Sequence, residues 1–183
     1  MIGESQVMAF EAKDETVGEL LNKVVFSVPR NQRRYVWEKE HWEELLEDIL
    51  FSCRAGKKAH FLGSIVLKDE GKKEGIARYT IIDGQQRVTT ITLIAIMKLF
   101  VEKNMQDEFL GTIDYVMTTN NRNQKMPILT SDYHLSLEKI INRIVEFDNS
   151  EAITIDAFVN SCILSSTKDK KIGDAIKVFY KAI

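Results

Sequence analysis

The residues best suited to chemistry lie in one short run, residues 79–92, which reads YTIIDGQQRVTTIT. Its centre combines an acid, a glycine, two amides and an arginine: Asp83, Gly84, Gln85, Gln86 and Arg87. The residues before this centre are typical of a β-strand and those after it of a helix, so the polar group falls at a helix start. A helix start offers unpaired N–H groups and the positive end of a dipole, which suit an anion such as phosphate. Arg87 can pair with phosphate oxygens, and Asp83 can hold a metal ion or orient a water molecule.

The same run also fits a plain turn between a strand and a helix, with Asp83 as the N-cap and both glutamines solvated. Gly84 suits both alternatives, because glycine adopts positive φ and also lets the backbone approach a ligand. Thr89 and Thr90 fall in the first turn of the helix, where their hydroxyls can contact a ligand or bond to the backbone. The spacing alone leaves the binding site and the capped turn open.

A second group of polar and aromatic residues occupies positions 30–37, which read RNQRRYVW. It follows a predicted strand over 24–28 that Pro29 ends. Three arginines, a glutamine and two aromatic residues are unusual in a plain connection, and loops on a rigid scaffold often carry binding groups. We expect the aromatic residues to pack on the core while Gln32 and Arg33 face a site. The alternative is an anchored loop with solvated arginines.

A predicted hairpin should carry a third element to the same place. The run 60–68 indicates a strand interrupted by Gly63 and Ser64, and a polar turn over 69–77 leads to the strand 79–82. This hairpin would place the glycine and the serine in the sheet that delivers Asp83.

The remaining pattern is mostly helical. The helix after the polar run extends to about residue 104 and is apolar almost all round, which predicts a central buried helix. Other helices are predicted over residues 16–22, where Thr16 and Glu19 form a capping box, 38–53, 107–119, 132–147, 151–165 and 171–183. Residues 126–130 (MPILT) indicate a short extended segment. The apolar pattern is still running at Ile183, from which we expect a truncated domain.

Composition narrows the class of protein. The 183 residues are 44% hydrophobic and 28% charged, as in ordinary soluble domains. The formal net charge is −2, so DNA binding would require a local basic patch. No apolar run reaches the roughly 18 residues that span a membrane, and the N-terminus does not resemble a secretory signal. Cys53 and Cys162 are predicted to be buried free thiols in a reducing compartment, so we expect a cytoplasmic protein without a membrane partner.

Several common catalytic patterns are missing from the sequence. It contains no GxxxxGK[ST] P-loop and no GxGxxG fingerprint. The histidines His41, His60 and His134 do not have the spacing of a metal-binding nuclease motif. Ser64 has no evident His–Asp partners, so a nucleophilic triad is unsupported.

Three motifs, taken in order, resemble the ParB/sulfiredoxin-like N-terminal domain of GmrSD-type restriction proteins. They are Gln32-Arg33-Arg34-Tyr35-Val36-Trp37, Leu62-Gly63-Ser64 and Ile82-Asp83-Gly84-Gln85-Gln86-Arg87-Val88-Thr89-Thr90. Order and spacing match over residues 16–104, and less specifically to 183. Arg34 stands where the family often has proline, and Val88 where it commonly has leucine. The resemblance implies an α+β fold with a small mixed sheet and packed helices over 1–104, followed by an all-α segment over 105–183.

The resemblance also implies a function and its residues. It points to a nucleotide-binding, NTP-hydrolysing regulatory domain of a modification-dependent restriction system that acts against phage DNA. The implied catalytic residues are Asp83, Gln85, Gln86 and Arg87, with Asp83 also holding Mg²⁺. The implied nucleotide contacts are Gln32, Arg33, Tyr35, Gly63, Ser64, Gly84, Thr89 and Thr90.

Two alternatives remain open for the role of this domain. Complete proteins of the family usually add a His-Asn-His nuclease domain, which nothing in this sequence matches, so we expect DNA to be engaged only in the full protein or a complex. One alternative is a non-catalytic module that senses a nucleotide or modified DNA and switches a partner nuclease. The other is a ParB-like nuclease in its own right.

Overall fold

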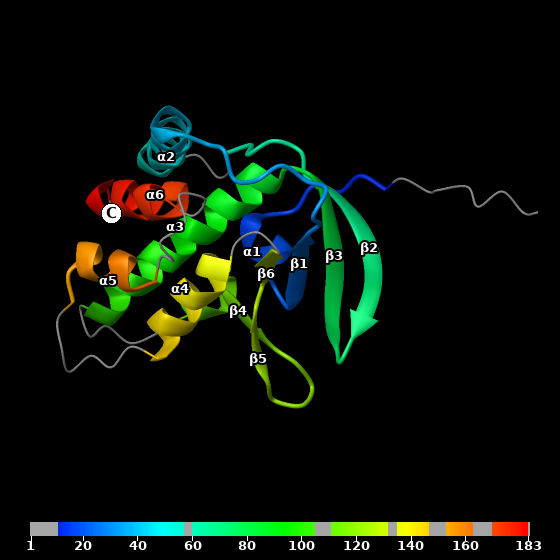
Figure 1. The fold of residues 1–183 in the computed structure, drawn as a ribbon. Coiled ribbons are helices and arrows are strands. Elements are labelled where there is room, and N and C mark those ends of the chain that lie inside the picture. The colour runs from blue at the N-terminus through cyan, green and yellow to red at the C-terminus, as the bar shows by residue number, and fades with distance from the viewer. Residues whose placement is uncertain are drawn as a thin grey trace, which may run out of the picture.

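A long helix, α3 (Gln85–Asn104), lies between a β-sheet and a group of helices in the computed structural model of the protein (Figure 1). The structure describes residues 11–56, 60–104, 111–131, 135–146, 153–162 and 170–182. The strands are β1 (Val24–Val28), β2 (Val66–Lys73), β3 (Ile76–Asp83), β4 (Met117–Thr119), β5 (Lys125–Pro127) and β6 (Leu129–Ser131). The other helices are α1 (Val17–Leu20), α2 (Lys39–Arg54), the 3₁₀ helix η1 (Thr112–Tyr115), α4 (Leu135–Glu146), α5 (Ile155–Cys162) and α6 (Lys170–Ala182).

Four strands form a mixed sheet in the order β2-β3-β1-β6. β2 and β3 are an antiparallel hairpin, whereas β1 runs parallel to both β3 and β6. The central strand β1 reads VVFSV and is buried at four of its five positions, as expected for a strand paired on both edges. β4 and β5 form a separate antiparallel pair. The predicted α+β class, with a small mixed sheet and packed helices, is therefore confirmed.

The predicted strand over 60–68 is largely wrong. β2 starts only at Val66 and continues to Lys73, so residues 69–73 are part of a strand and not of the predicted turn. Charged residues are tolerated there because β2 is an edge strand, where charge also discourages pairing with another chain. Gly63 has φ +92°, which an extended strand does not accommodate. Gly63 and Ser64 therefore lie in the segment before the sheet.

The predicted helix over 107–119 is also wrong where the structure describes it. Residues 112–115 form the 3₁₀ helix η1, and β4 follows. Gly111 precedes η1 with φ +87°. Ile128 N donates to Val116 O, so the backbone here bonds to a neighbouring segment and does not continue an α-helix. The extended segment predicted over 126–130 is confirmed by β5 and β6. Because β6 pairs with β1, the part after residue 104 contains strands as well as helices.

The other predicted elements agree with the structure within its described residues. The capping box of Thr16 and Glu19 opens α1, and the predicted central helix is α3, which is buried through most of its length. Phe100 of α3 packs against Phe158 of α5 with ring centroids 4.8 Å apart. Of the two free cysteines, Cys162 is buried but Cys53 is exposed, which corrects the prediction for Cys53. None of the described helices has the length and apolar character needed to cross a membrane.

Candidate functional site

The start of α3 is shaped by a glycine with a positive φ angle. β3 ends at Asp83, α3 begins at Gln85, and Gly84 between them has φ +89°. A Cβ atom at this position would lie 3.0 Å from Ile65 Cγ1 and 3.2 Å from Ile65 Cα, so a larger residue would clash as well as strain the backbone. The Gly84 carbonyl accepts the helical bond from Val88 N at 3.1 Å, which makes Gly84 the N-cap. Asp83 is therefore not the N-cap, and its carboxylate is exposed beside the helix start.

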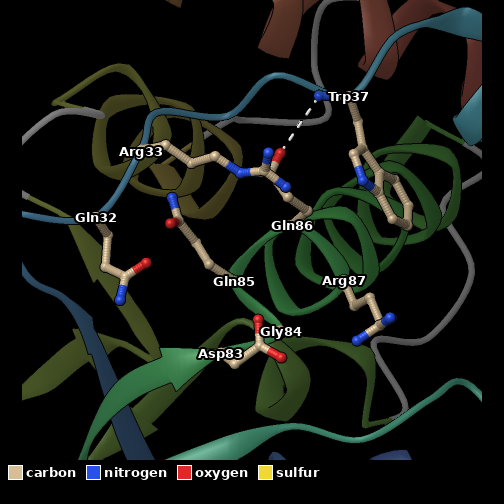
Figure 2. Close-up of a pocket in the computed structure, with 8 residues that line it drawn as sticks. All are labelled: Gln32, Arg33, Trp37, Asp83, Gly84, Gln85, Gln86 and Arg87. Carbon is tan, nitrogen blue, oxygen red and sulfur yellow. Dashed lines mark hydrogen bonds between the residues drawn. The ribbon is translucent and has the colours of Figure 1, made fainter.

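A polar pocket opens in front of this helix start (Figure 2). Two segments line it: Gln32, Arg33 and Trp37 come from the loop before α2, and residues 83–87 come from the end of β3 and the start of α3. The predicted meeting of the 30–37 loop with the Asp83–Arg87 run is thus observed. The lining contains two guanidinium groups and one carboxylate, and the positive end of the α3 dipole adds to the excess of positive charge. Such a pocket favours an anion.

Gln86 holds the loop to the helix. Its Oε1 accepts hydrogen bonds from the backbone N–H groups of Val36 and Trp37 at 2.8 and 3.3 Å. Its Nε2 donates to the carbonyl of Arg34 at 3.0 Å. The Gln86 amide, for which the family resemblance implies a catalytic role, is thus bonded on both sides to loop backbone.

Two further side chains, those of Gln32 and Lys171, fix the same loop. Gln32 Nε2 donates to the Ile82 carbonyl at 2.9 Å, which ties the loop to the end of β3. Lys171 of α6 donates to the Val36 carbonyl at 3.3 Å and to Glu38 Oε1 at 2.6 Å. The hydrogen bond from Lys171 and its charge lower the pKa of Glu38. Sequence reasoning missed Lys171, because nothing in a sequence shows that the last helix reaches this loop.

Tyr35 and Thr90 lie beneath the pocket and do not line it. Their hydroxyl oxygens are 2.8 Å apart, and Thr90 Oγ1 also donates to the Gln86 carbonyl. Tyr35 stacks on Trp42 of α2, with ring planes 7° apart. Burial raises the pKa of the Tyr35 phenol to about 12, so the hydroxyl stays protonated as a hydrogen-bond donor. In this structure both residues support the loop from below.

Arg87 is held by the segment that carries Gly63 and Ser64. Its Nη1 donates to the Ser64 carbonyl at 2.9 Å. Its guanidinium lies directly over Gly63, where an added Cβ would come within 2.9 Å of Arg87 Cζ. Gly63 and Ser64 thus approach the site, as predicted, but they contact Arg87 and do not line the pocket.

Gln85 and Thr89 differ from the adjacent Gln86 and Thr90, because their side-chain polar atoms have no hydrogen-bond partner among the residues that the structure describes. Gln85 is 4% exposed and Thr89 is 1% exposed. Both side-chain amide atoms of Gln85 and the hydroxyl of Thr89 are buried without a hydrogen-bond partner among the described residues. Gln85 lines the pocket, and Figure 2 shows its amide directed toward the side chains of Gln32 and Arg33.

Asp83 is the single carboxylate among the residues that line the pocket. Among the described residues, no group of three or more His, Cys, Asp and Glu side chains could hold a metal ion. Mg²⁺ is commonly bound by one or two carboxylates together with substrate phosphates and water. The chemistry of this pocket therefore fits Mg²⁺ only as an ion shared with a phosphate ligand.

Trp37 is a lining residue that the sequence analysis treated as a core anchor. It is half-buried and stacks on His41 of α2, with ring centroids 5.7 Å apart. Its position next to the polar residues of the 30–37 loop is the one sequence feature that could have indicated that Trp37 lines the pocket.

The fold and the pocket define a class: a mixed α+β domain with a polar pocket at the point where a strand is followed by a buried helix. A family model supplies the identity within this class. The model of the GmrSD restriction endonuclease N-terminal domain matches residues 17–183, and the chain belongs to that family. It is thus a domain of a restriction, or defence, protein family. No curated protein matches the chain at a significant level.

Proposed function

We propose that this domain binds a nucleoside triphosphate in the pocket at the start of α3 and hydrolyses it with Mg²⁺. The observation that carries the proposal is the convergence of Arg33, Arg87 and the α3 N-terminus on one pocket whose single carboxylate is Asp83. A triphosphate presents several negative oxygens close together, which is the charge that two guanidinium groups and a helix dipole stabilise. Membership of a restriction endonuclease family supports a regulatory use of the nucleotide.

Each residue has a role in this proposal. Arg87, fixed by the Ser64 carbonyl, binds phosphate oxygens and stabilises the charge that moves onto the leaving group. Arg33 is exposed and closes the pocket from the loop side. Asp83 would hold Mg²⁺, which on binding would neutralise charge on the phosphates. Gln86, Tyr35 and Gln32 keep the loop in place and act through it.

The nucleotide would control cleavage of modified DNA by a nuclease domain or subunit. The pocket is too small a feature to track a DNA duplex, and the chain carries a formal net charge of −2. We therefore expect DNA contact and cleavage to need a partner nuclease, with the nucleotide state of this domain setting when it acts.

Phosphate release tests the proposal. Wild-type protein with Mg²⁺ and each of ATP, GTP, CTP and UTP should release phosphate from at least one, and Asp83→Ala and Arg87→Ala should each lower the rate about 100-fold or more. Asp174→Ala on α6 and Arg54→Ala at the end of α2 are matched controls, since both residues are exposed and lie outside the pocket lining. Equal rates in all five proteins would reject the assignment. Nucleotide binding without release would reject hydrolysis and favour a sensing module.

A further inference from the structure

On one face of the first turns of α3, three buried side-chain atoms have no hydrogen-bond partner within the part of the chain that the structure describes. They are Gln85 Oε1, Gln85 Nε2 and Thr89 Oγ1. Residues four apart on a helix are neighbours on its surface, so the amide and the hydroxyl share one small region next to the pocket. A buried polar atom that lacks a hydrogen bond costs about 1–3 kcal/mol, so such atoms normally have a water or a ligand as partner.

The adjacent residues show that this region is not simply loosely packed. Gln86 makes three hydrogen bonds to backbone, and the hydroxyls of Thr90 and Thr92 donate to the carbonyls one turn earlier. Two of the side chains in this stretch, Gln85 and Thr89, thus differ from residues of the same type beside them. Of the two consecutive glutamines in the motif, Gln86 bonds to the backbone of the loop, whereas the Gln85 amide has no hydrogen-bond partner among the described residues.

The Gln85 amide needs a ligand that can both accept and donate a hydrogen bond. Nε2 donates and Oε1 accepts, so a phosphate, which at neutral pH mainly accepts, satisfies Nε2 but not Oε1. A water molecule beside a phosphate satisfies both, because water donates to Oε1 while a phosphate oxygen accepts from Nε2. The proposed hydrolysis requires this pair, a water and a terminal phosphate held next to each other.

We propose that Gln85 is the catalytic residue that orients the attacking water, and that Thr89 is a positioning residue that holds the Gln85 amide and this water. The inference rests on the proposed nucleotide hydrolysis and assigns the group that the sequence left open between Gln85 and Gln86. In the step, the water oxygen forms a bond to the terminal phosphorus and the bridging P–O bond breaks. The electron pair of that bond leaves on the oxygen of the nucleoside diphosphate. One proton of the water stays on the oxygen that is now bonded to phosphorus, and the other passes to another oxygen of the released phosphate.

Access to Gln85 depends on Arg33. The Gln85 amide is shielded from solvent, and Figure 2 shows the Arg33 side chain on the side toward which the amide points. Arg33 is exposed, so its side chain can turn toward a bound phosphate at little cost. A phosphate that attracts Arg33 would then occupy the space beside Gln85. The attacking water would be enclosed there, and bulk solvent would stay excluded.

The test separates binding from turnover in the full chain. Gln85→Leu and Thr89→Val are compared with wild type and with Thr92→Val, a matched control whose hydroxyl bonds only to its own helix. For the nucleotide that wild type hydrolyses fastest, kcat and KM are measured, and Kd is measured with its β,γ-imido analogue. Thermal unfolding verifies that each variant is folded.

Gln85→Leu should lower kcat by about 100-fold or more, with a Kd for the analogue within about threefold of wild type. Thr89→Val should lower kcat by about tenfold with KM little changed, and Thr92→Val should match wild type. A Gln85→Leu protein with wild-type kcat would overturn the role of Gln85 but leave the proposed function standing. A Gln85→Leu protein that loses kcat and analogue binding in parallel would have the same consequence. A wild type that binds the analogue but hydrolyses no nucleotide would overturn the proposed function and this step with it.

Discussion

At the scale of single residues, the position of Arg87 depends on a glycine from a distant part of the sequence. The guanidinium lies over Gly63 and donates to the Ser64 carbonyl. Because Gly63 has φ +92°, a replacement there has two effects, backbone strain and displacement of Arg87. A second glycine separates these effects. Gly71 has φ +77°, and apart from its two chain neighbours no described residue has an atom within 4 Å of where its Cβ would be.

Gly63→Ala and Gly71→Ala should therefore lose similar stability but differ in activity. Each substitution should cost about 1–3 kcal/mol of unfolding free energy through its positive φ. Only Gly63→Ala moves the guanidinium, so it alone should lower phosphate release, by about tenfold or more. Urea unfolding and the release assay measure the two effects. A Gly63→Ala protein with the activity of Gly71→Ala would show that the contact with Gly63 does not position Arg87.

The sequence predicted which segments meet at the pocket better than it separated the roles of their residues. Gln32 and Arg33 were predicted to face the Asp83–Arg87 run, and these residues do line one pocket. The roles of Gln85 and Gln86 could not be told apart, because adjacent residues of one type differ only in the direction they take from the helix, about 100° apart. That direction decides which amide contacts the loop backbone. Because tertiary packing places the loop, the sequence does not show that Gln86 is the one that contacts it.

At the scale of elements, the loop before α2 is positioned by bonds from three different elements. Gln86 of α3 bonds to its backbone, Gln32 bonds from the loop to the end of β3, and Lys171 of α6 donates to the Val36 carbonyl. The loop carries Arg33 and Trp37 into the pocket, so its order and the shape of the pocket are linked. Gln86 is the most buried of the three contacts, at 6% exposed.

Gln86→Leu should destabilise the protein, whereas Gln85→Leu should not. The first change removes three hydrogen bonds to loop backbone and should cost about 2 kcal/mol of unfolding free energy. The second removes two buried polar atoms that have no hydrogen-bond partner among the described residues, so stability should stay equal or rise. Urea unfolding gives both values, and hydrogen exchange at Val36 and Trp37 should speed up in Gln86→Leu alone. Equal losses in the two variants would contradict the division between the two glutamines.

Local sequence patterns predicted a helix or strand well where its apolar residues are the ones that are buried in the structure. α2 follows from its apolar periodicity, α3 from a long run that is apolar almost all round, and β1 from its β-branched and aromatic residues. β2 was misplaced because an exposed edge strand carries the charged residues of a turn. The helix predicted over 107–119 failed because Met117–Thr119 pair with β5 in a hairpin, and this pairing outweighs the helical pattern of the residues before it.

At the scale of the whole molecule, the sheet and the buried helix both depend on residues far along the chain. Phe26 N in β1 donates to the Ile128 carbonyl at 2.7 Å, and Thr130 Oγ1 of β6 donates to the Phe26 carbonyl at 3.1 Å. Phe100 of α3 packs on Phe158 of α5 and on Tyr180 of α6, with ring centroids 4.8 and 5.9 Å apart. A division of the chain at residue 104 would separate these partners.

A fragment of residues 1–104 should therefore fail to fold by itself, although it contains every residue that lines the pocket. Removing the later residues would expose the side of α3 that faces α6 and leave the β1 edge unpaired, and both changes favour aggregation. The loop would also lose the bond from Lys171 to the Val36 carbonyl. We expect residues 1–183 to unfold cooperatively on heating, followed by circular dichroism, and the fragment to show no cooperative transition and no binding of the nucleotide analogue. A fragment that melts cooperatively and binds the analogue would establish an independent domain ending at 104, with the later helices and strands as an addition to it.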